Sequence, residues 1–182
     1  MKYFLVALFD ELSNPIIQNI QKDICTKYKL YKSSPIIYIP ITAITNPDLE
    51  KLDVVISKII VPYKKFKVGI HNSISLSENF SQVNLKVEDK GYIYRIARNI
   101  IDTLDLHGFN VKNDDVSIDL HILLANANHI IKKSCNGGTI AIDDTINKDE
   151  FFKFAKVSRL ELWKQISTKK EIVVKTYALR DY

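Results

Sequence analysis

A histidine interrupts an aliphatic run in the second half of the chain. The segment SIDLHILLANA (residues 117–127) places His121 among leucine, isoleucine and alanine side chains, with Asp119 two residues before it. An imidazole titrates close to neutral pH, so it can serve as a general acid or base or donate a hydrogen bond to an anion. An isolated histidine in such a run is also often a structural residue of the core or of a sheet edge. Both interpretations of His121 stay open from the residues alone.

A second histidine stands beside a hydroxyl, and the cysteines carry no pattern. His71, in GIHNSIS, precedes Ser73 by two residues, and we expect it on the polar face of a hairpin. If His71 entered the same pocket as His121, it would supply a second imidazole. Cys25 and Cys135 lie far apart without CxxC spacing, which argues against a disulfide scaffold and a zinc site. No histidine or carboxylate pair has metal-ligand spacing, so we predict no metal and no cofactor.

Composition indicates a globular protein with a mild preference for anionic partners. The chain has 182 residues, of which 46% are hydrophobic and 26% are charged, values typical of one folded domain. Its formal net charge of +5 favours nucleotides, RNA or phosphates as partners. The apolar run YFLVALF is too short to span a membrane and is followed at once by Asp10 and Glu11. We therefore expect a cytoplasmic protein without a membrane partner.

The spacing of apolar residues predicts the order of the elements. Helices are expected over residues 13–28, after Asn46 and Pro47 as far as Pro62, over 91–108 and over 147–155. Strands are expected over residues 1–10, 35–44, 65–77, 81–89 and 116–127, with a closing hairpin of 155–166 and 171–181. Residues 130–143 are expected to form a turn within a hairpin or a short connection. This order is neither a strict alternation nor all-β, so it predicts an α+β fold with a mostly antiparallel sheet.

The two halves of the chain repeat one pattern. Each half holds a strand, a helix and then an aliphatic strand, at residues 35–44 and 116–125. This order, with MKYFLVALFDE, SIDLHILLA and VSRLELWKQISTKKEIVVKTYAL, resembles the two-histidine phosphoesterase superfamily, which includes bacterial 2′-5′ RNA ligase-like proteins. The resemblance covers nearly the whole chain. It implies one domain, 1–182, of two pseudo-symmetric lobes of mainly antiparallel sheet, backed by helices, around a central cleft. The lobes would be residues 1–64 with the hairpin 155–182, and residues 65–154.

The family signature is a pair of His-x-Thr/Ser motifs, one on the central strand of each half. Residues two apart on a strand face the same side, so each histidine and its hydroxyl enter the cleft together. One imidazole then acts as base and the other as acid, while the hydroxyls hold the phosphoryl oxygens without a metal.

This chain keeps half of each motif. In PIT, Pro40 stands where the histidine belongs, and Thr42 supplies the hydroxyl. In HIL, His121 is present, and Leu123 replaces the hydroxyl. Tyr38 and Asp119 flank these positions two residues earlier on the two strands.

The resemblance implies a cleft that binds a nucleotide or short RNA phosphodiester, either 2′,3′-cyclic or 2′-5′-linked. His121 would be the remaining acid, base or hydrogen-bond donor, and Thr42 the phosphate ligand, with Tyr38 and Asp119 beside them. Loss of one general acid or base typically costs about a hundred- to ten-thousand-fold in rate, and a phenol with a pKa of about 10 is a poor substitute. Two alternatives therefore stay open: a slow, metal-free phosphodiesterase, and a nucleotide-sequestering or interaction protein without catalysis.

Overall fold

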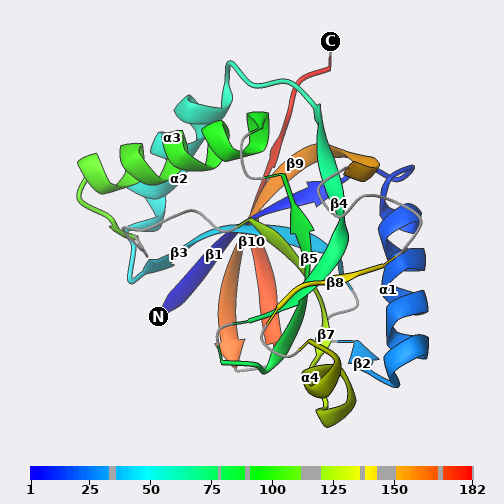
Figure 1. Cartoon of the computed structure of the whole chain (residues 1–182). Helices are drawn as coiled ribbons and strands as arrows, with labels where there is room; N and C mark the ends of the chain where they lie inside the picture. Colours follow the sequence, from blue (N-terminus) through cyan, green and yellow to red (C-terminus); the bar gives the residue numbers. More distant parts are fainter. Residues whose placement is uncertain are drawn as a thin grey trace.

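The computed structural model describes residues 1–32, 36–77, 79–88, 91–111, 120–135, 138–142, 151–167 and 170–181, without the side chains of residues 151 and 152. Over these residues the chain folds as an α+β protein with a mostly antiparallel sheet and four helices (Figure 1). This confirms the fold class that the sequence predicts. None of the helices within the described ranges is long and apolar enough to cross a membrane.

The described part of the chain forms ten strands and four helices. The strands are β1 (Lys2–Phe9), β2 (Tyr31–Lys32), β3 (Tyr38–Thr45), β4 (Phe66–Leu76), β5 (Gln82–Val87), β6 (Asn110–Val111), β7 (His121–Asn126), β8 (Ile140–Ala141), β9 (Phe151–Ser167) and β10 (Lys170–Ala178). The helices are α1 (Asn14–Tyr28), α2 (Leu49–Ile60), α3 (Tyr92–Leu106) and α4 (His129–Cys135).

Local signals fix the ends of the long helices. Pro15 lies in the first turn of α1, where a missing N–H costs nothing, and Lys29 closes that helix in a left-handed conformation with φ of 54°. Asp48 caps α2, because its Oδ1 accepts hydrogen bonds from the backbone N–H groups of Glu50 and Lys51 at 3.1 and 3.2 Å. Gly108, with φ of 77°, allows the chain to turn back after α3.

One long strand joins the two halves of the sheet. The strand order is β2-β7-β5-β4-β9-β1-β3-β6, with β10 beside β9 and β8 beside β4. Residues 151–157 of β9 pair with β4, whereas residues 157–164 pair with β1. The sheet is therefore continuous through β9.

The halves exchange their helices and short strands. β2 follows α1 but pairs with β7, and β6 follows α3 but pairs with β3. Accordingly, α1 contacts β7 and α3 contacts β3. Gln21 of α1, which is 2% exposed, donates from Nε2 to the carbonyl oxygen of Leu124 in β7 at 2.7 Å. The strands β3 and β7, which are the equivalent strands of the two halves, also contact each other.

Apolar residues gather in a large core on one face of the sheet and a small cluster on the other. All four helices contribute their buried residues to the large core, together with alternate strand residues such as Leu5, Ile39 and Ile122. The small cluster consists of Val6, Leu8 and Trp163, with Phe4 and Tyr38 packed against it. No helix residue of the described chain belongs to this cluster. We call the side of the sheet that carries it, opposite the large core, the helix-free face.

Two expectations for the C-terminal third are wrong. Residues 130–143 do not form a hairpin turn: α4 occupies His129–Cys135, and β8 follows it. The side chain of Asn128 caps α4, since its Oδ1 accepts from the N–H groups of Ile130 and Ile131 at 3.0 and 3.1 Å. The helix predicted over 147–155 is also wrong in its described part, because residues 151–155 begin β9. Pairing with β4 overrides the local helical pattern there. Residues 112–119 and 143–150 lie outside the described part of the chain.

We expect Gln21→Ala to lower the free energy of unfolding by about 1–3 kcal/mol, because the buried hydrogen bond between α1 and β7 is lost. Urea unfolding followed by circular dichroism measures this change. The matched control is Gln18→Ala on the exposed side of the same helix, which should leave the urea midpoint unchanged. Equal midpoints for the two variants would show that the contact between α1 and β7 contributes nothing to stability.

Candidate functional site

His121 begins β7 and faces the side of the sheet away from α1. Ile122 and Leu124 of the same strand point to the opposite face and are fully buried in the large core. His121 itself is partly exposed. Lys86 of β5 is its direct partner across the antiparallel ladder. Directly opposite residues in such a ladder share a face, with their Cβ atoms about 4.5–5.5 Å apart. The side chains of His121 and Lys86 therefore start from neighbouring positions on one face of the sheet.

An asparagine with an unsatisfied oxygen lies next to this pair. Asn84 precedes Lys86 by two residues on β5, and it is opposite Leu123 of β7 and Ser75 of β4. It is only 5% exposed, and its Oδ1 is buried without a hydrogen-bond partner in the described structure. A buried amide oxygen without a partner costs free energy, and a bound ligand can supply the missing donor.

Tyr38 lies on β3 opposite Leu8 and belongs to the helix-free face. Its ring contacts the indole of Trp163 edge to face, with 4.7 Å between the ring centres. Burial raises the pKa of the Tyr38 phenol, and the negative charge of Glu171 raises it further. Tyr38 therefore keeps its proton near neutral pH and is able to donate a hydrogen bond.

A row of polar residues along β9 continues this face. Arg159, Glu161 and Trp163 are opposite Leu8, Val6 and Phe4 of β1. The carboxylate of Glu161 accepts hydrogen bonds from Nε of Arg159 at 2.8 Å and from Nε1 of Trp163 at 2.7 Å. Both carboxylate oxygens are engaged, so Glu161 orients its neighbours and is poorly placed to act as a base.

Thr42 lies beyond an irregularity in β3. Val6 of β1 pairs with Pro40, but the preceding residue, Leu5, pairs with Thr42. β3 therefore has one extra residue between Pro40 and Thr42. This bulge interrupts the alternation that would place Thr42 on the same face as Tyr38. Leu5 is fully buried in the large core, and Thr42 is 8% exposed. The Thr42 hydroxyl donates to the carbonyl oxygen of Ala43 at 3.5 Å.

Two of the predicted residues lie on strands that contact each other: Tyr38 on β3 and His121 on β7. His71 lies on β4 opposite Phe151, partly exposed, and is two strands away from His121, because β5 runs between β4 and β7. Asp119 lies outside the described residues.

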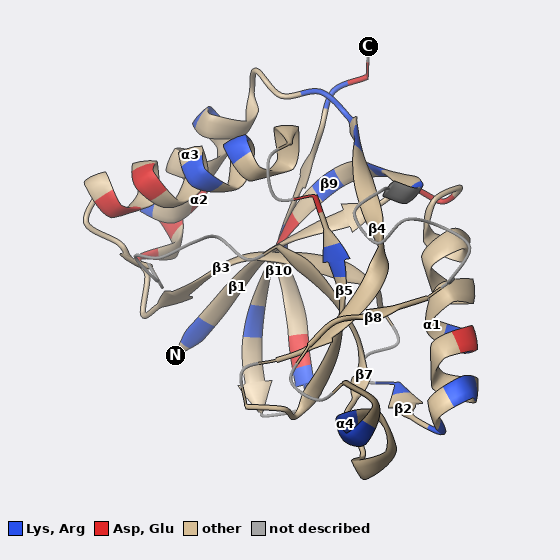
Figure 2. Ribbon diagram, viewed as in Figure 1, with Lys and Arg blue, Asp and Glu red and all other residues tan. Residues whose placement is uncertain are grey.

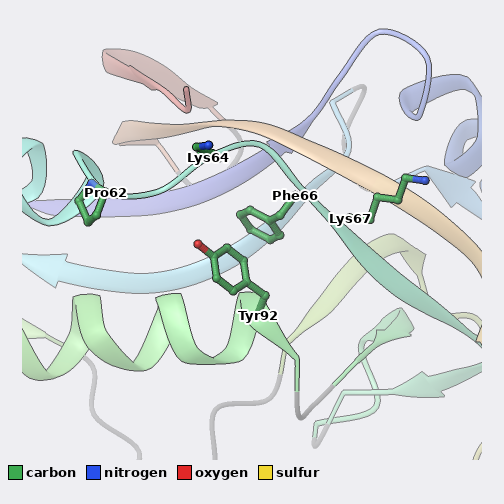
Figure 3. A pocket seen from close by; sticks show the side chains of 5 residues that line it. All are labelled: Pro62, Lys64, Phe66, Lys67 and Tyr92. Carbon is green, nitrogen blue, oxygen red and sulfur yellow. The ribbon is translucent and has the colours of Figure 1, made fainter. Parts of the chain in front are cut away.

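A hollow of about 400 Å³ lies elsewhere, between β4 and the start of α3. It is lined by Pro62, Lys64, Phe66, Lys67 and Tyr92, and Figure 3 shows the rings of Phe66 and Tyr92 turned toward each other while Lys67 points away from them. None of the predicted site residues lines it. In the described part of the chain, no group of three or more histidine, cysteine or acidic residues is placed to hold a metal ion.

Sequence reasoning misses Lys86, Asn84 and Glu161. The alternation of QVNLKV, with polar residues at 82, 84 and 86, indicates that these residues share a face. It does not say which strand lies beside them, because the pairing of Lys86 with His121 joins residues 35 positions apart. Glu161 sits in a similar alternation, RLELW.

Comparison with known proteins gives matches in structure only. No family model matches the chain, and no curated protein matches it in sequence. The solved structure of TT0787 from Thermus thermophilus superposes with a TM-score of 0.68 at 14% identity, over 100% of this chain and 99% of that one. A phosphoesterase superposes with a TM-score of 0.61 at 12% identity, over 99% of both chains. LigT of E. coli, complexed with 3′-AMP, gives 0.64 at 11% identity, over 98% of this chain and 97% of that one.

These superpositions span nearly the whole length of both partners. The chain therefore shares the fold of these solved structures, a phosphoesterase and LigT among them.

Proposed function

We propose that this protein binds the phosphate of a nucleotide or short RNA, as a 2′,3′-cyclic or 2′-5′-linked phosphodiester, with catalysis weak or lost. The observation that carries the proposal is the His121–Lys86 pair on the helix-free face, in a chain with this fold. Solved structures of LigT from E. coli contain 3′-AMP, NADP+, ATP or phosphate, so that protein binds phosphorylated nucleotides on the same scaffold.

Each polar group of the site has a role suited to an anion. Lys86 supplies a positive charge, and His121 donates a hydrogen bond beside it. Asn84 adds an amide that burial holds in one place, and Tyr38 adds a phenol that keeps its proton. The roles of Thr42 as phosphate ligand and of Asp119 beside His121 stay predictions from the sequence.

The shortage of suitable acids and bases among the described site residues supports the proposal of weak catalysis. Cleavage of a phosphodiester needs a base for the attacking hydroxyl and an acid for the leaving oxygen within one turnover, and His121 can be only one of them. The raised pKa of Tyr38 makes it a weaker acid than a free phenol. The carboxylate of Glu161 is already bound by Arg159 and Trp163.

An active, metal-free phosphodiesterase is the second candidate. His121 occupies the histidine position of the second family motif, and His71 is a further imidazole on the same sheet, two strands away. In that case His121 would be the general acid or base. A protein that only sequesters the nucleotide, or that serves only as an interaction protein, would show no turnover, in contrast to this candidate.

The first test is the fate of the ligand. We expect isothermal titration calorimetry to detect binding of adenosine 2′,3′-cyclic phosphate, and phosphorus NMR to show that it is returned largely intact. Any residual hydrolysis should fall by about a hundredfold or more in His121→Ala, the usual loss for one general acid or base.

The matched control is His107→Ala, an exposed histidine at the end of α3. Turnover in His121→Ala equal to that of the wild type would exclude His121 as acid or base. Absence of both binding and turnover in the wild type, with this ligand and with 2′-5′-linked diadenylate, would end the proposal.

The second test removes the cation opposite His121. Lys86→Gln should weaken binding of the cyclic nucleotide about ten- to hundredfold, because a charged hydrogen bond contributes about 1.5–3 kcal/mol. Calorimetry at one fixed salt concentration measures the change in Kd. Lys22→Gln, on the exposed side of α1, is the control for loss of one positive charge and should bind as the wild type does. Equal Kd values for both variants would place the ligand elsewhere.

A further inference from the structure

Five lysines gather at the edge of the sheet that β2 forms. β2 is the last strand on that side and carries Lys32, while Lys27 and Lys29 lie at the end of the preceding helix, α1. Lys132 and Lys133 lie on α4. All five are exposed, and Figure 2 shows lysine or arginine at the end of α1, on β2 and on α4, at the lower right. We call these five residues the basic edge.

One asparagine holds the two segments of the basic edge together. Nδ2 of Asn128 donates to the carbonyl oxygens of Tyr28 and Lys29 at 2.9 and 3.1 Å. Its Oδ1 accepts from the N–H groups at the start of α4. The N–H of Lys132 donates to the carbonyl oxygen of Asn128 at 3.2 Å, so Lys132 lies one turn into that helix. The end of α1 and the start of α4 therefore keep a fixed relation.

Few acidic groups oppose the charge of the basic edge. None of the ion pairs between described residues involves these five lysines. Nζ of Lys27 lies 5.5 Å from the ring centre of Tyr28. Burial raises the pKa of the Cys25 thiol, and the positive charge of Lys32 opposes that effect. Asp23 is the only acidic residue in α1, β2, β5, β7 and α4 together. An anionic partner would therefore meet five cations and one acid.

Two aromatic rings are exposed at the same edge. Tyr31 of β2 is 86% exposed and pairs with Asn126 of β7. Phe80, on the turn between β4 and β5, is 48% exposed. The residue after it, Ser81, accepts at its carbonyl oxygen a hydrogen bond of 2.8 Å from the N–H of Ala127. Since β7 lies between β2 and β5, the two backbones are about 10 Å apart, the width of two strand spacings.

The turn between β4 and β5 holds Phe80 in an unfavourable conformation. Its φ of 54° lies in the left-handed region, which bulky side chains rarely adopt. Oδ1 of Asn79 accepts from the hydroxyls of Ser77 and Ser81 at 2.8 and 2.6 Å. Oγ of Ser77 accepts from the N–H of Gln82 at 3.0 Å. These bonds fix the turn, so the ring of Phe80 is presented to solvent from a defined backbone.

We propose that the basic edge docks on the surface of an anionic lipid bilayer, with the rings of Phe80 and Tyr31 in the interfacial layer and the lysines against the lipid headgroups. Lysine clusters are attracted to anionic leaflets, and aromatic side chains favour the boundary between headgroups and acyl chains. A bilayer surface is broad, so the contact needs no hollow. The edge contains no arginine, the residue favoured for bidentate recognition of single phosphates in nucleic acid.

This contact is separate from the phosphate site. His121 begins β7, whereas the basic edge borders the other end of that strand. None of the proposed docking residues belongs to the site of His121, so the inference does not rest on the proposed function. It departs from the expectation of no membrane partner, which followed from the lack of a spanning segment. A peripheral contact needs no such segment.

The test is sedimentation with vesicles of phosphatidylcholine, prepared with or without phosphatidylglycerol. We expect the wild type to sediment with the mixed vesicles and to stay in solution with pure phosphatidylcholine. The double variant Lys132→Gln, Lys133→Gln should bind the mixed vesicles about 25-fold more weakly, because each lysine near an anionic surface contributes about fivefold. The matched control is Lys58→Gln, Lys67→Gln, which removes two exposed lysines from α2 and β4 and should bind as the wild type does.

A second variant tests the ring. Phe80→Asn should weaken binding to the mixed vesicles about tenfold, because burial of a phenylalanine side chain contributes at least that much. Asparagine adopts the left-handed conformation readily, so the turn is retained. Leu106→Ala is the control, since Leu106 is 87% exposed at the end of α3 and should not affect binding. Circular dichroism confirms that all variants fold.

Four results would overturn the proposal. Equal loss in the two double variants would show a response to net charge and not to the basic edge. Equal binding of the wild type to both kinds of vesicle would exclude a role for anionic lipid. Unchanged binding of Phe80→Asn would exclude insertion of the ring. A wild type that sediments with neither vesicle would end the proposal, and fluorescent polyuridylate titrated into the wild type and the lysine variant would then show whether the edge binds nucleic acid instead.

Discussion

The pairing of β9 with two different strands is the constraint on which the candidate site depends. Its first half is hydrogen-bonded to β4 and its second half to β1, so the sheets of the two halves keep one fixed relation. Arg159, Glu161 and Trp163 on its second half thereby lie on the same continuous sheet as Lys86 and His121. β9 thus links, through β1 and β4, the parts of the sheet that carry Tyr38 and His121.

The composition of the proposed site favours affinity over rate. In that proposal, Lys86 attracts a negative ester in the ground state and in the transition state alike, and such uniform binding lowers the ligand concentration needed without accelerating the reaction. Acceleration needs groups that change protonation during the reaction. The phenol of Tyr38, whose pKa is raised, does not provide one near neutral pH. Both oxygens of the Glu161 carboxylate are already bound by Arg159 and Trp163. These groups are consistent with the proposed function, in which the protein mainly holds its ligand.

Sequence patterns predict the elements better than they predict the site. The helical stripes and caps around Pro15, Asp48 and Gly108 are local, so the three long helices follow from the residues themselves. The start of β9 is not local, because residues 151–155 become a strand only by pairing with β4. Lys86 and Asn84 are missed for the same reason, as register between distant strands is set by the folded sheet. The extra residue between Pro40 and Thr42 changes the register of one strand, which periodicity cannot foresee.

The exchange of helices between the halves has a consequence for how the chain reaches its native state. Gln21 meets Leu124 across 103 residues, and Asn128 meets the carbonyl oxygen of Tyr28 across 100, so native contacts have a large sequence separation. Such a topology has high contact order and folds slowly. During synthesis the apolar side of α1 emerges long before β7 exists to cover it, which exposes the nascent chain to aggregation. The N-terminal half alone therefore lacks the strand that α1 packs against in the folded protein.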